Sequence, residues 1–62
     1  MASERLNYRD ASIVWLLHWS GWTQQKIAAA FGVNQGRINE VLHGDKFPDA
    51  EYQASVANKH LY

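Results

Sequence analysis

The chain has 62 residues, of which 47% are hydrophobic and 19% charged, with one proline and no cysteine. At this length folding buries only about 60% of the surface that the unfolded chain exposes, so the chain has room for one small domain and excludes a second. Without cysteine there are no disulfides and no thiolate metal sites, and packing or oligomerisation must stabilise the fold. The formal net charge of +0 differs from the strongly basic balance typical of nucleic-acid-binding domains.

The first expected helix covers residues 8–20. Asn7 is a suitable N-cap, and Asp10 follows at the position where a carboxylate can complete a capping box. Gly21 ends the apolar pattern. The apolar residues at helical spacing, which we expect to face the core, are Ile13, Leu16 and Leu17.

The second expected helix covers residues 24–31. Thr23 is a good N-cap, and Gly32 can supply the left-handed residue that ends a helix. The residues expected to share its core-facing side are Ile27, Ala28 and Phe31.

The third expected helix covers residues 35–43, with Asn34 as its N-cap and Gly44 closing it. Pro48 favours the start of a fourth helix over residues 49–58. The apolar residues that recur in helix three at steps of three and four are Ile38, Val41 and Leu42.

These patterns predict an all-α fold of three to four helices in a single domain over residues 1–62, with no alternating strand pattern. The dense apolar run 13–17 is far shorter than the roughly 20 residues that a membrane span needs. The absence of cysteine is typical of an intracellular protein. We therefore expect a soluble protein located in the cytoplasm.

Helices two and three are separated by a short turn that contains Gly32. Helices joined in this way cross steeply, so they share one core while the second helix stays exposed as a ridge. A ridge of this kind fits the major groove of DNA. The sequence thus predicts a helix-turn-helix at residues 23–43.

The spacing of particular residue types within this segment makes the pattern more specific. A threonine and a glutamine open helix two, a small residue lies at the helix crossing, glycine makes the turn, and a β-branched residue anchors helix three. These residues are Thr23, Gln24, Ala28, Gly32 and Ile38, with Ile27, Phe31, Val33 and Val41 at the other core positions. Residues 43–52, HGDKFPDAEY, then follow with a glycine, a lysine and a proline.

With these features, residues 23–48 resemble the helix-turn-helix DNA-binding family. The resemblance is closest to its phage-repressor (Cro or XRE-like) branch, and homeodomain-like modules of the resolvase type are a near alternative. It implies a sequence-specific, double-stranded DNA-binding protein: a small transcriptional regulator, such as a bacterial or phage repressor, associated with the nucleoid. It also implies that helix 35–43 enters the major groove.

The face of helix three that points away from its apolar residues is polar. Glutamine and asparagine can pair with adenine, arginine with guanine, and glutamate can accept from the cytosine amino group. By resemblance Gln35, Gly36 and Glu40 lie at base-contacting positions, with Arg37 and Asn39 nearer phosphates or flanking bases. The candidate base-reading residues are therefore Gln35, Gly36, Arg37, Asn39 and Glu40.

Glycine inside a helix costs about 1 kcal/mol relative to alanine, so Gly36 needs an explanation. Close approach of the backbone to DNA is one, and tolerance of glycine in a fraying first turn is the other.

Phosphate contacts are expected from the N-terminal end of helix two, where unpaired amides attract anions, and from scattered basic side chains. Arg5 and Arg9 also fit a minor-groove arm or ordinary surface residues. His43 suits either a phosphate contact or the C-terminal end of the helix dipole. The candidate phosphate-contacting residues are Thr23, Gln24, Gln25, Lys26, His43, Lys46, Arg5 and Arg9.

Helix one is apolar on several sides, because its tryptophans lie away from its aliphatic stripe. An exposed aromatic surface of this size is expected to be covered, either by the tail of the same chain or by a second copy in a homodimer. A pair would also read two half-sites of DNA about one helical turn apart. The residues assigned to dimer or tail packing are Trp15, Trp19, Trp22, Tyr52 and Val56.

Catalysis is not expected. The three histidines, His18, His43 and His60, are far apart, and the chain has no glycine-rich phosphate loop and no nucleophile arrangement. We therefore expect no catalytic residue, cofactor, metal or small-molecule substrate. The alternative to DNA binding is a helical adaptor or antirepressor that holds another protein through Trp15 and Trp19, which the neutral net charge favours.

Overall fold

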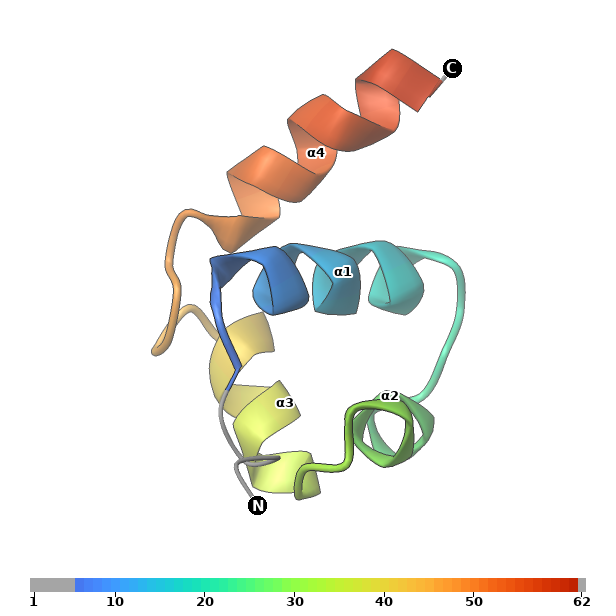
Figure 1. The fold of residues 1–62 in the computed structure, drawn as a ribbon, viewed down its shortest axis with the longest axis vertical. Coiled ribbons are helices and arrows are strands. Elements are labelled where there is room, and N and C mark those ends of the chain that lie inside the picture. The colour runs from blue at the N-terminus through green and yellow to red at the C-terminus, as the bar shows by residue number, and fades with distance from the viewer. Residues whose placement is uncertain (1–5, 62) are drawn as a thin grey trace.

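The computed structural model describes residues 6–61 and confirms the all-α prediction. The described chain forms four helices: α1 (Tyr8–Trp19), α2 (Gln24–Phe31), α3 (Gln35–Leu42) and α4 (Ala50–Leu61). In Figure 1, α4 lies on one side of α1, and α2 and α3 lie on the other. The predicted bounds of the first three helices agree with the structure to within one residue, and α4 runs three residues beyond its predicted end.

The helix starts are fixed by the predicted capping residues. The Asp10 amide donates to the Asn7 side-chain oxygen at 2.8 Å, and the Asn7 amide donates to the Asp10 carboxylate at 3.3 Å, which completes a capping box on α1. Thr23 accepts from the Lys26 amide at 3.1 Å and caps α2. Each side chain pairs an amide that the first helical turn leaves without a backbone partner.

The core gathers small and branched side chains from every helix. Ile27 and Ile38 are fully buried, and they are the largest side chains buried to that degree. Leu6, Trp15, Leu17, Trp22, Phe31, Leu42 and Phe47 pack around the core with part of their surface exposed. The other buried members of the core cluster are Ala11, Val14, Ala28, Val33, Val41 and Ala50. The apolar faces predicted for helices two and three are thus confirmed.

The predicted core face of α1 was wrong in part: Leu17 packs against the core as expected, but Ile13 does not. Ile13 is 37% exposed, whereas Ala11 and Val14 are fully buried. Since α1 packs against α4 and also against α2 and α3, its buried positions are those where close contact requires short side chains. Trp15 lies one turn after Ala11 on the same side of α1, and it packs against the core with part of its surface exposed.

The tail folds back on α1, but through residues other than the ones expected. Ala50 and Ala54 are fully buried, one turn apart on α4, the helix that makes the most extensive contact with α1. Tyr52 and Val56 are 73% and 36% exposed. Each lies two positions after a buried alanine, about 200° around the helix, so close contact at the alanines turns both outward.

Candidate nucleic-acid interface

The turn between α2 and α3 is fixed by its backbone and by a buried side chain. Gly32 has φ 70° and ψ 29°, the left-handed conformation that glycine adopts without strain. The Val33 amide donates to the Ala28 carbonyl at 3.1 Å, and the Val33 side chain is buried. The start of α3 is therefore held in one position relative to α2.

The outer face of α3 carries the residues assigned to base reading. Ile38 and Val41 hold the opposite face in the core. Gln35, Gly36, Arg37 and Asn39 are exposed and Glu40 is half-buried, so the structure brings these five residues to one helix as predicted. They form a polar ridge that solvent reaches.

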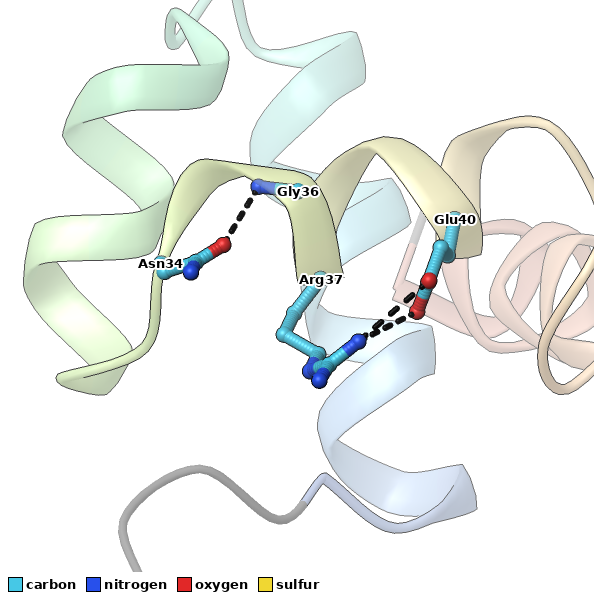
Figure 2. A network of polar contacts seen from close by, with 4 residues as sticks. All are labelled: Asn34, Gly36, Arg37 and Glu40. Carbon is cyan, nitrogen blue, oxygen red and sulfur yellow. Dashed lines mark hydrogen bonds and ion pairs between the residues drawn. The ribbon is translucent and has the colours of Figure 1, made fainter.

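Two residues of this ridge form an ion pair (Figure 2). Arg37 Nη1 donates to Glu40 Oε1 at 3.1 Å and to Oε2 at 3.3 Å. From the sequence alone, the two side chains have separate expected roles on DNA. Their contact could have been predicted, because opposite charges three residues apart on a helix are neighbours.

The glycine at position 36 has a structural explanation that the sequence analysis missed. The Gly36 amide donates to the Asn34 side-chain oxygen at 2.8 Å, which caps α3 (Figure 2). A Cβ atom on Gly36 would lie 3.0 Å from that same oxygen, closer than most such contacts. Glycine at this position therefore leaves room for the cap.

The candidate phosphate contacts come from several elements. Lys26 lies in the first turn of α2, and its Nζ is 4.7 Å from the centre of the Trp22 ring, a cation–π distance. His43 is exposed, and its Nδ1 donates to the Asn39 carbonyl at 3.0 Å. This hydrogen bond ties the His43 ring to the last turn of α3.

The remaining candidates differ in exposure. Thr23, Gln25, Arg9 and Lys46 are exposed, and Gln24 is half-buried. Arg5 lies outside the described residues. The Thr23 hydroxyl accepts from the Lys26 amide, and its own proton is still available to donate to a phosphate oxygen.

The tryptophans divide between core and surface. Trp15 and Trp22 pack against the core, whereas Trp19 is 44% exposed and lies with its ring centre 5.6 Å from that of Trp15. A shallow depression lies beside Trp19, between α1 and the start of α4. Its lining residues are Trp19, Pro48, Glu51, Tyr52 and Ser55.

Other kinds of site have little support in the described chain. Within residues 6–61, no three His, Cys, Asp or Glu side chains come close enough to share a metal ion. None of the described helices combines the length and the apolar character that a membrane crossing requires.

Comparisons with known proteins add no relative: no protein-family model matches the chain, and no curated protein or solved structure matches it significantly.

Proposed function

We propose that the protein is a sequence-specific double-stranded DNA-binding protein, a small transcriptional regulator of the helix-turn-helix type that acts in the cytoplasm at the nucleoid. The observation that supports this most is the division of α3 into two faces. Ile38 and Val41 fix one face in the core, and the other presents five residues assigned to base reading to solvent. The major groove, about 12 Å wide, admits such a helix.

The charges around α3 suit modest affinity for each subunit. Lys26, Lys46 and Arg9 are exposed and can reach phosphates, whereas Arg37 is already paired with Glu40. Each phosphate contact positions the protein without reading sequence, and base preference comes from side chains at the groove floor. Gln35 and Asn39 carry the amide groups that pair with adenine.

Substitutions on the two kinds of contact should separate these roles. Gln35→Ala should relax base preference at one or two positions of each half-site, by about 1 to 3 kcal/mol. Lys26→Ala should weaken binding to all sequences alike, because a phosphate contact carries no base information. Selection from a random duplex library, followed by sequencing, measures both effects. If Gln35→Ala selects the same sequence logo as the parent, Gln35 is not a base-reading residue.

We also propose that the working form is a homodimer that pairs through the exposed apolar side chains of Trp19, Tyr52 and Val56. All three are exposed large hydrophobic residues; Trp19 and Tyr52 line one depression, and Val56 follows one turn after Tyr52 on α4. Covering them stabilises a chain that has no disulfide, and symmetric pairing doubles a small set of basic groups.

Sedimentation at micromolar concentration tests the pairing. The parent should sediment as a dimer, and Tyr52→Ser should shift it toward the monomer while leaving the helical circular dichroism unchanged. Gln53→Ser, at an exposed neighbouring position of α4, is the matched control. A parent that remains monomeric both free and on DNA contradicts the dimer.

The same exposed side chains support a second candidate function, a helical adaptor or antirepressor that binds another protein. Trp19 and Tyr52 line one depression with Pro48 between α1 and α4, and aromatic side chains of this kind are enriched in protein interfaces. Such a contact depends little on salt, whereas DNA binding depends on it strongly. The response to salt therefore distinguishes the two functions.

A further inference from the structure

Glu40 is an unusual residue to find on a helix proposed to lie in the major groove. It is the one acidic residue of α3, and its side chain is 34% exposed on the polar ridge. DNA carries one negative charge for about every 1.7 Å of its axis. A free carboxylate at this position therefore repels DNA and opposes the entry of α3.

The contact with Arg37 removes this repulsion. Nη1 lies 3.1 and 3.3 Å from the two carboxylate oxygens, so one guanidinium nitrogen bridges both (Figure 2). The two charges cancel within one turn of α3, whose other residues are uncharged. The contact also restricts both long side chains, which lowers the entropy lost when either one is ordered on DNA.

The pair keeps the capacity to bind a base. An ionised carboxylate has about four lone-pair sites, and the contact with Nη1 occupies only part of them. The amino group of cytosine is the base donor that a carboxylate accepts from in the major groove. Glu40 therefore retains an acceptor for cytosine while its charge is balanced.

We propose that Arg37 is a positioning residue: it neutralises and orients Glu40, which reads the amino group of one cytosine in each half-site. This inference rests on the proposed DNA-binding function and assigns Arg37 and Glu40 to a single unit. Glu40 supplies the base specificity, and Arg37 offsets the repulsion between the Glu40 carboxylate and the phosphates.

The unit predicts that removing Glu40 changes base preference in the parent and overall affinity in the Arg37→Ala background. In the parent, Glu40→Ala should lower the preference for the cytosine position by roughly fivefold or more. Arg37→Ala should weaken binding to every duplex about tenfold, because it leaves a carboxylate without its partner beside the phosphates. In the Arg37→Ala background, Glu40→Ala should then raise affinity rather than lower it.

The experiment measures dissociation constants for the parent, both single variants and the double variant. Each is titrated with the selected site and with duplexes in which each C·G pair is replaced in turn. The control is Lys46→Ala, which removes the same charge from the loop after α3 and is exposed. Adding Glu40→Ala to Lys46→Ala should restore less affinity than it restores in Arg37→Ala, because Lys46 is not the partner of Glu40.

Three results would overturn the inference. Additive effects of Arg37→Ala and Glu40→Ala would show two independent residues. Equal rescue of Lys46→Ala and Arg37→Ala by Glu40→Ala would show an effect of total charge alone. An unchanged preference at every C·G position in Glu40→Ala would remove Glu40 from base reading. In each case the parent still binds DNA, whereas a parent that binds no duplex contradicts the proposed function itself.

Discussion

Ile38→Ala should lower the free energy of unfolding by about 2 to 5 kcal/mol, the usual cost of truncating a buried isoleucine. Ile38 is fully buried and attaches α3 to the core. A domain of this size has a total stability of only about 3 to 9 kcal/mol, so the variant should be largely unfolded at mild urea concentrations. Urea denaturation followed by circular dichroism measures the loss.

The neighbouring exposed residue provides the control for Ile38. Asn39→Ala should change stability by less than about 0.5 kcal/mol, as expected at a surface position. If Ile38→Ala unfolds at the same urea concentration as the parent, α3 is not fixed by the core. The polar ridge would then lack the rigid support that base reading requires.

Ala28→Leu should destabilise the fold by roughly 1 to 3 kcal/mol through overpacking. Ala28 is 5% exposed in the core cluster and lies on α2, which packs against α3. Extra methylenes at this position must displace one helix or strain their side chains. Thermal melts followed by circular dichroism test the effect.

Two adjacent alanines offer a matched comparison for this substitution. Ala29→Leu and Ala30→Leu make the same chemical change in the same helix, at exposed positions. Both should leave the melting temperature close to that of the parent, because both side chains are exposed. A melting temperature for Ala28→Leu equal to theirs would contradict the pairing of α2 with α3.

Local signals predicted the helix boundaries well. Asn7, Thr23 and Asn34 each place a side-chain oxygen against an amide a few residues away, so neighbouring sequence decides these caps. The face that α1 buries depends on distant contacts instead. Ile13 and Val14 are both apolar, and only the docking of α4 on one side and of α2 and α3 on the other selects Val14.

The candidate site was predictable in part for the same reason. Helical periodicity alone placed Ile38 and Val41 in the core and left Gln35 and Asn39 to solvent, and the structure confirms that division. The pairing of Arg37 with Glu40 was also predictable, because opposite charges three residues apart on a helix lie on the same face. The outward position of Tyr52 followed from no local pattern, because the burial of Ala50 and Ala54 where α4 packs on α1 determines it.

The measurement that tests DNA binding most directly is the salt dependence of binding to a random duplex. Each phosphate contact releases condensed counterions, so the logarithm of the binding constant should fall linearly with the logarithm of salt concentration, by about 0.9 per contact. The exposed Lys26, Lys46 and Arg9 predict a slope of roughly −2 to −4 for each subunit. A flat response, or no binding at low salt, would contradict DNA binding and leave the adaptor as the function of this protein.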